Sequence, residues 1–179
     1  FPMISPDNEL IFYTRKKSKA GMGDELYKDA LVVEEFTFSQ RPDINALFSG
    51  GEGLKSPFNT GEFSNYGSAT LSVDNKEMII CACKKEIVYG RDYLNCDLYS
   101  TKYERSGAGG NDFNWTPLVN LGPNINTKDG WEAQPSLSAD GNTLFYTAAR
   151  PTTRDNDIFI SLRNADGTWG QARPFDEIN

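Results

Sequence analysis

The sequence predicts an all-β protein made of about three copies of one four-stranded antiparallel sheet. Two observations support this prediction. Turn-forming Gly, Pro, Asn, Asp and Ser are spread evenly through the 179 residues, and one short motif occurs three times. No window shows a sustained apolar stripe at helical spacing, so helices are not expected to build the core.

The repeated motif contains a serine followed two residues later by an aspartate. Its copies read ISPDNELIFY, LSVDNKEMII and LSADGNTLFY, and they align without a gap. The serines are Ser5, Ser72 and Ser138, which lie 67 and 66 residues apart. An aspartate can bond its own backbone in a turn, and the Asn or Gly that follows it tolerates positive φ. The motif therefore predicts a tight turn between two strands, which we call strands a and b.

Further repeated elements predict strands c and d. An acidic residue precedes an aliphatic–aromatic pair in DELY at Asp24, CDLY at Cys96 and NDIF at Asn156. The acidic residues, which would open strand c, are Glu25, Asp97 and Asp157. Strand d is expected near the segments that begin at Trp115 and Trp169. A short element with an asparagine precedes each later copy or ends the chain, reading FNT at Phe58, INT at Ile125 and EIN at Glu177.

A four-stranded antiparallel unit repeated in tandem is typical of a β-propeller blade. We expect one blade each at residues 1–57, 58–122 and 123–179. One such sheet cannot bury both of its faces alone, so it stacks on its neighbours. Because complete propellers have about four to eight blades, three blades do not close a ring. The chain is therefore expected to be a fragment of a five- or six-bladed propeller, or to close its stack against another copy or another chain.

The repeats resemble the TolB-like, WD-like (PD-type) propeller repeats of Bacteroidetes envelope proteins. The resemblance is closest over residues 115–179, which contain PSLSADGNTLFYTAARP and DNDIFISLRNADGTWGQARPFDEIN. It extends to residues 58–103 and 1–27, whereas residues 28–56 form a longer segment without a W-x-x-P strand.

The resemblance implies a non-enzymatic scaffold or protein–protein interaction module in the bacterial cell envelope, periplasmic and associated with the outer membrane. Similar propellers occur in PorE-like, OmpA-family lipoproteins of the type IX secretion and gliding machinery. The expected partners are therefore envelope proteins, together with the remaining blades of the same propeller or another chain.

Composition narrows the chemistry that the chain can perform. The formal net charge of −7 argues against a nucleic-acid partner, and no apolar stretch of about 18 residues predicts a membrane span. The chain contains no His, which removes the commonest general base, and it lacks a G-x-S-x-G nucleophile elbow. We expect no enzymatic activity and no cofactor.

The Asp-Gly turn of the third copy is expected to be structural. It departs from the Asp box of sialidase-like propellers, because Gly141 comes one residue early and no Trp follows Thr143. The chain also lacks the alternating carboxylates and the final glutamate of an EF-hand calcium loop. We therefore expect no metal site.

The cysteines are Cys81, Cys83 and Cys96, so at least one thiol is free or paired outside the chain. Cys81 and Cys83 point the same way if they lie in one strand. A cross-strand disulfide from Cys96 to either of them is one interpretation, and buried thiols are the other. A closed zinc site would need a carboxylate as its fourth ligand.

Basic residues gather in the connections expected between strands b and c. In a blade these connections and the d–a connections share one face, so the chain would present a basic rim on that face. The aromatic residues Tyr89, Tyr93 and Trp131 are expected there too. The candidate partner-binding residues are Arg15, Lys16, Lys84, Lys85, Tyr89, Arg91, Trp131, Arg150 and Arg154.

Such a rim would bind an acidic protein surface, an anionic glycan or a peptide carboxylate. The alternative is solvated loop charge that neighbouring acids neutralise, such as Asp129, Glu132 and Asp155. The alternative function is a propeller that binds or processes glycans or peptidoglycan.

Overall fold

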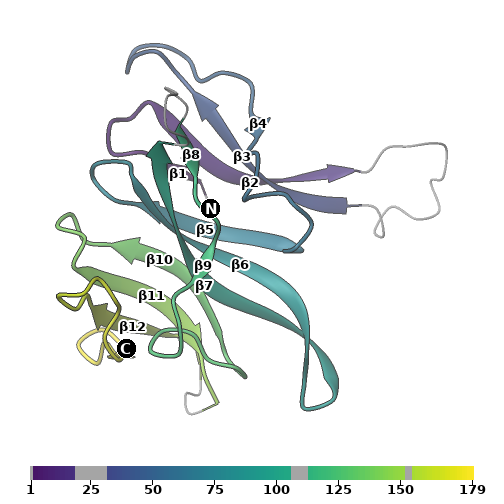
Figure 1. Ribbon diagram of the computed structural model, residues 1–179, viewed down its shortest axis with the longest axis vertical. Helices are drawn as coiled ribbons and strands as arrows, with labels where there is room; N and C mark the ends of the chain where they lie inside the picture. The colour runs from purple at the N-terminus through teal and green to yellow at the C-terminus, as the bar shows by residue number, and fades with distance from the viewer. Residues whose placement is uncertain (1, 19–31, 106–112, 152–154) are drawn as a thin grey trace.

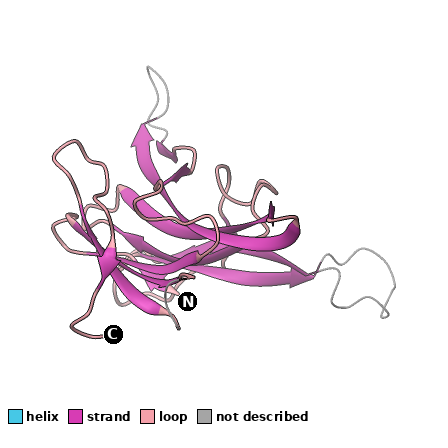
Figure 2. Ribbon diagram, turned by 90° about the horizontal axis from the view of Figure 1, so that it is seen from below, coloured by secondary structure: helices cyan, strands magenta, loops and turns pink. Residues whose placement is uncertain are grey.

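The computed structural model describes residues 2–18, 32–105, 113–151 and 155–179, whose strands form three antiparallel sheets (Figure 1). These residues contain strands, turns and loops but no helix (Figure 2). The predicted all-β class is therefore confirmed. Within the same ranges, a helix long and apolar enough to span a membrane is absent.

The sheets follow one another along the chain. Sheet 1 contains β1 (Met3–Ile4), β2 (Leu10–Ser18), β3 (Val32–Gln40) and β4 (Glu52–Gly53). Sheet 2 contains β5 (Asn65–Leu71), β6 (Glu77–Val88), β7 (Arg91–Arg105), β8 (Phe113–Trp115) and β9 (Val119–Asn120). Sheet 3 contains β10 (Trp131–Leu137), β11 (Thr143–Ala149), β12 (Asp157–Leu162) and β13 (Arg173–Pro174). Each sheet draws its strands from one of the three repeats.

The serine–aspartate motif forms the a–b turn of every sheet, as predicted. In sheet 2 the Ser72 hydroxyl donates to Asp74 Oδ1 over 2.6 Å and accepts from the Glu77 backbone N–H over 2.9 Å. The residue after the aspartate has positive φ in each copy: Asn8 at 62°, Asn75 at 59° and Gly141 at 71°. The hydroxyl and the left-handed residue therefore close the turn locally, which accounts for the motif without a ligand.

Strand c of sheet 1 differs from the prediction. The segment expected to form it, 24–27, lies outside the described residues, and β2 pairs instead with β3. Glu35 pairs with Arg15, the same register position that Asp97 and Asp157 take in β7 and β12. Glu35, and not Glu25, is therefore the first copy of the acidic residue of strand c. A longer b–c connection moved the strand along the sequence without changing its register.

Two hydrophobic cores lie on opposite faces of sheet 2. Met78 and Ile80 of β6 pack toward sheet 1 with Phe12 and Phe36, in a core rich in stacked aromatic rings. The alternating residues of β6 pack toward sheet 3, with Leu144, Tyr146 and Phe159. Because successive residues of a strand point to opposite faces, β6 is buried on both faces and forms the centre of the stack.

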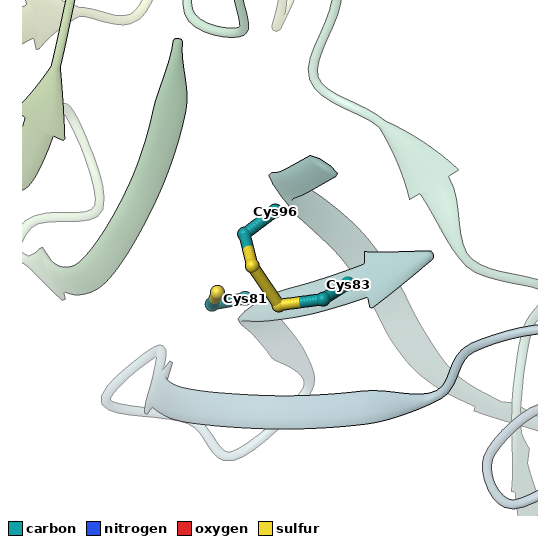
Figure 3. A group of neighbouring side chains, drawn as sticks. All are labelled: Cys81, Cys83 and Cys96. Atoms are coloured by element: carbon teal, nitrogen blue, oxygen red, sulfur yellow. A yellow bond between two sulfur atoms is a disulfide. The ribbon is translucent and has the colours of Figure 1, made fainter. Parts of the chain in front are cut away.

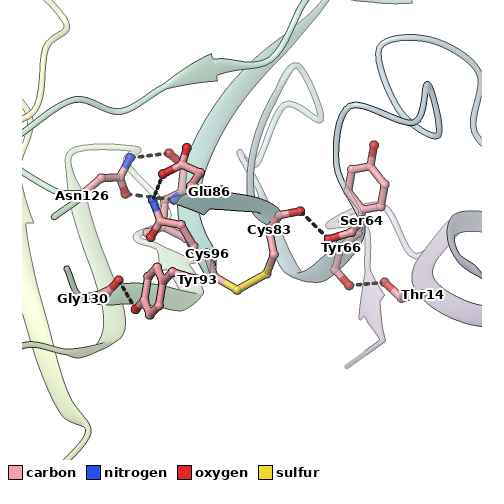
Figure 4. Close-up of a disulfide and its surroundings, with 11 residues drawn as sticks. Thr14, Ser64, Tyr66, Cys83, Glu86, Tyr93, Cys96, Asn126 and Gly130 are labelled. Atoms are coloured by element: carbon pink, nitrogen blue, oxygen red, sulfur yellow. Dashed lines mark hydrogen bonds between the residues drawn. A yellow bond between two sulfur atoms is a disulfide. The ribbon is translucent and has the colours of Figure 1, made fainter. Parts of the chain in front are cut away.

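The cysteines lie on β6 and β7, on the face of sheet 2 that packs toward sheet 3. Cys83 pairs with Cys96 in the β6–β7 register, and the two form a disulfide (Figure 4). Cys81 keeps its thiol and is buried, and burial raises the pKa of that thiol to about 12, with Asp97 and Glu132 adding to the rise. The alternatives that the sequence leaves open are thus resolved as one disulfide and one buried thiol.

Candidate functional site

A cleft of about 640 Å³ opens between sheets 2 and 3, where the connection into β10 meets the end of β11. Tyr93 of β7 forms one wall and donates a hydrogen bond from its hydroxyl to the Gly130 carbonyl over 2.8 Å (Figure 4). The complete lining is Tyr93, Asp129, Gly130, Trp131, Ala149, Arg150, Pro151, Asp155 and Asn156. The structure thus brings together Trp131 and Arg150, two of the predicted binding residues.

Arg150 is held by the protein itself. Its Nη2 donates to the Ile125 carbonyl and to the Tyr146 hydroxyl, each over 2.9 Å. Its guanidinium carbon lies 4.0 Å from the centre of the Phe159 ring, and only 13% of its side chain is exposed. Arg150 therefore holds the end of β11 against the core. Its guanidinium already has partners within the protein in the absence of a ligand.

Glu132 is the acidic partner of Arg150 and lies at the floor of this region. It is fully buried, with Oε1 3.8 Å from Arg150 Nε. Thr127 donates to it twice, from its backbone N–H over 3.1 Å and from its hydroxyl over 2.8 Å. Burial raises the pKa of Glu132 to about 7, although the Thr127 hydrogen bonds and Arg150 oppose the rise. Glu132 therefore titrates in the physiological range.

The other predicted basic residues that the structure describes lie on strands and not in loops. Arg15 and Lys16 belong to β2, where Arg15 forms an ion pair of 2.7 Å with Glu35 and donates to the Gly51 carbonyl. Lys84 and Lys85 belong to β6, and Lys84 lies 3.3 Å from a Glu86 oxygen. The strand pairs β2–β3 and β6–β7 are longer than expected. The basic residues that were expected in loops therefore belong to paired strands.

Arg91 and Tyr89 flank the tip of the β6–β7 hairpin. Tyr89 and Gly90 have φ of 50° and 75°, which is the pattern of a two-residue type I′ turn, and Arg91 opens β7. The Tyr89 hydroxyl lies 3.4 Å from an Asp129 oxygen, so this tip stands beside the cleft. Arg154 lies outside the described residues.

Of the predicted residues, the structure brings Trp131 and Arg150 together in the cleft and places Tyr89 beside it, and one basic rim shared by all of them stays a prediction. The β2–β3 and β6–β7 strand pairs both extend from the stack on the side away from the a–b turns (Figure 1). Asp129 and Asp155 line the cleft together with Arg150, whose guanidinium forms an ion pair with Glu132.

The sequence reasoning assigned no role to one set of residues, the asparagines of the FNT, INT and EIN elements. Asn126 accepts from the Leu98 backbone N–H and donates to the Leu98 carbonyl, both over 2.9 Å. Asn59 does the same with Phe36, and Asn179 with Ile158. Each asparagine thus replaces a neighbouring strand for one residue of strand c. The recurrence of the asparagine was the available signal, and we call this contact the asparagine clamp.

Sheet 3 exposes one face that has no neighbour among the described residues. Leu144, Tyr146 and Ala148 of β11 are buried against sheet 2, but the residues between them are only partly buried. The opposite face carries the apolar side chains Phe145, Ile158, Ile160, Leu162 and Phe175. The equivalent positions of β6 are apolar and are buried under sheet 3. This face of sheet 3 is also apolar, but no sheet of the described residues packs on it.

No protein-family model matches the chain, and a search of curated proteins found no match either.

Proposed function

We propose that this chain is part of a β-propeller that acts as a non-enzymatic, protein-binding scaffold. The observation that carries the proposal is the asparagine clamp. Asn59 holds strand c of sheet 1 and is followed by β5, and Asn126 holds strand c of sheet 2 and is followed by β10. Asn179 makes the same contact with sheet 3. The clamp therefore marks the passage from one blade to the next.

The exposed face of sheet 3 supports the same proposal. A face with Phe145, Ile158 and Ile160 resembles the faces that sheets 1 and 2 bury against their neighbours. Contiguous apolar surface of this kind marks an interface in soluble proteins. A further blade of the same type would cover it, as the stacking of single sheets requires.

The residues that line the cleft support the proposal that a partner binds there. Trp131 and Tyr93 are aromatic residues with a polar edge, the type enriched where protein interfaces bind most tightly. Tyr93 is fixed by its bond to Gly130, so one wall is already ordered before a partner binds.

The disulfide supports a place outside the cytosol. Disulfides such as Cys83–Cys96 persist in oxidising compartments, including the bacterial periplasm. This agrees with the resemblance to TolB-like propellers of the Bacteroidetes envelope, and we propose a periplasmic, outer-membrane-associated role that includes secretion or gliding complexes.

Site-specific photo-crosslinking in cells of the source organism tests the partner proposal. A photoreactive residue replaces Trp131 in one strain and Asp140, on an a–b turn of the same sheet, in the other. We expect discrete protein adducts only from position 131, and we expect the Tyr93→Ala variant to weaken them. Equal adducts from both positions, or none from position 131, would refute binding at the cleft.

Glycan binding is the second candidate, because Trp131 lies beside Asp129 in the cleft and this pairing of a ring with a carboxylate suits a sugar face and its hydroxyls. Calorimetry with soluble muropeptides distinguishes the two functions. Saturable heat that the Trp131→Ala variant loses would favour the glycan, and absence of heat would favour the protein partner.

A further inference from the structure

The cysteines form a compact cluster of sulfur atoms on one face of β6 and β7 (Figure 3). The three Sγ atoms lie within 4.8 Å of one another. Cys81 and Cys83 share a face because they are two apart in one strand, and Cys96 lies directly opposite Cys83. The cluster is therefore set by strand register, and the hairpin holds it without help from a flexible loop.

The surroundings enclose the cluster. Cys81 and Cys83 are 3% and 6% exposed, and the same core contains Leu98 and Leu144. Residue 67 on β5 is a glycine, and a Cβ at that position would stand 3.0 Å from Cys81 Sγ. Because Gly67 has no side chain, the Cys81 sulfur has room beside β5.

We propose that reduction of the Cys83–Cys96 disulfide creates a three-thiolate site for a soft monovalent cation, of which Cu(I) is the type. A dithiol reductant supplies two electrons and two protons, which open the S–S bond to two thiols while the reductant becomes a disulfide. Cu(I) then forms three S–Cu bonds, and the three thiol protons pass to solvent.

The geometry suits this coordination. Three sulfurs bound at roughly 2.3 Å around one ion in a plane stand roughly 4 Å apart. All three sulfurs already lie within 4.8 Å of one another, and the two sulfurs of the disulfide move apart toward this spacing once their bond opens. Thiolate ligands select Cu(I) over hard cations. The chain has no His to complete a tetrahedral zinc site of the usual kind.

The proposed site differs from the expectation of no metal, which rested on the missing His and on the calcium pattern.

Anaerobic titration of the reduced and oxidised protein with Cu(I), in competition with a chromophoric Cu(I) chelator, tests the proposal. We expect one Cu(I) per reduced chain, with ultraviolet thiolate-to-copper absorption, and no binding by the oxidised chain. The Cys81→Ser variant keeps the other two thiols, and we expect it to bind at least about tenfold more weakly, a loss typical of a metal site that loses a supporting group.

Circular dichroism in the near ultraviolet shows whether the reduced chain stays folded. If reduction loosens the fold, Cu(I) should restore the folded signal in the wild type and not in Cys81→Ser, since a ligand that binds the folded state stabilises it. Equal affinity of the wild type and Cys81→Ser, or binding by the oxidised chain, would overturn the proposal. If reduction loosens the fold, failure of Cu(I) to restore the folded signal would overturn it too.

Discussion

The side-chain amide of Asn126 accepts from the Leu98 backbone N–H and donates to the Leu98 carbonyl, each over 2.9 Å, across 28 residues of sequence. The same carbonyl also accepts from the Leu121 N–H over 3.1 Å. Leu98 is fully buried in the second core, and the amide of Asn126 lies almost as deep, at 9% exposure. The pair joins strand c of sheet 2 to the connection that enters sheet 3. The same contact recurs at Asn59 and Asn179, so this relationship organises the whole stack.

Replacing Asn126 by Ala should therefore lower stability markedly. The change leaves the Leu98 N–H buried without a partner, whereas the Leu98 carbonyl keeps its bond from the Leu121 N–H, and we expect a loss of about 1–3 kcal/mol in the free energy of unfolding. Urea denaturation followed by circular dichroism measures it. Asn179→Ala is the matched control, because that clamp is exposed and should cost under about 1 kcal/mol. Equal losses for the two variants would contradict this account of the buried clamp.

Glu132 should make stability depend on pH. Its folded pKa of about 7 lies above the ordinary value of 4.5, so the folded chain keeps a proton that the unfolded chain releases. The contribution of Glu132 to stability should thus fall as pH rises from about 4.5 to 7, by about 3 kcal/mol in total, and stay level above that range. The difference between wild-type and Glu132→Gln unfolding curves at several pH values isolates this term. A difference that does not change with pH would contradict it.

The ion pair between Arg163 and Glu77 should couple sheets 2 and 3. Arg163 Nη2 lies 2.8 Å from Glu77 Oε2, both side chains are 18% exposed, and the guanidinium stacks on the Trp169 ring. A double-mutant cycle with Arg163→Ala and Glu77→Ala should give a coupling energy of about 1 kcal/mol. The more exposed pair Lys84–Glu86, within one strand, serves as the control and should give less. A coupling for Arg163 no larger than the control would count against a role in joining the sheets.

Ser138 should set the acidity of Asp140. The Ser138 hydroxyl donates to Asp140 Oδ1 over 2.5 Å, and this bond, followed by that from the Asn142 N–H, holds the pKa of Asp140 below 3.8. In Ser138→Ala the pKa should rise toward 3.8, which carboxyl carbon chemical shifts in an NMR pH titration would show. Asp166 takes its hydrogen bonds from Thr168 and should not change. An unchanged pKa for Asp140 in the variant would refute the assigned cause.

The sequence by itself determined the turns and the class of the fold. The Ser–Asp–Asn/Gly motif closes its own turn through bonds between residues at most five apart, so it specifies the same geometry wherever it occurs. The block of apolar residues that follows the turn in each copy, such as LIFY and TLFY, then predicts strand b. For this reason the hairpins at Ser5, Ser72 and Ser138 were predictable without knowledge of the rest of the chain.

Only the tertiary structure decided which distant groups meet. It assigned strand c of sheet 1 to β3, paired Cys83 with Cys96, and turned Arg150 inward onto Ile125 and Glu132. Arg150 was predicted to bind a partner because it lies in an expected b–c connection where basic residues gather, whereas its environment comes from β10, β12 and the connection before them. Contacts across tens of residues depend on how the sheets stack, and side-chain type alone does not specify which of several compatible partners is within reach.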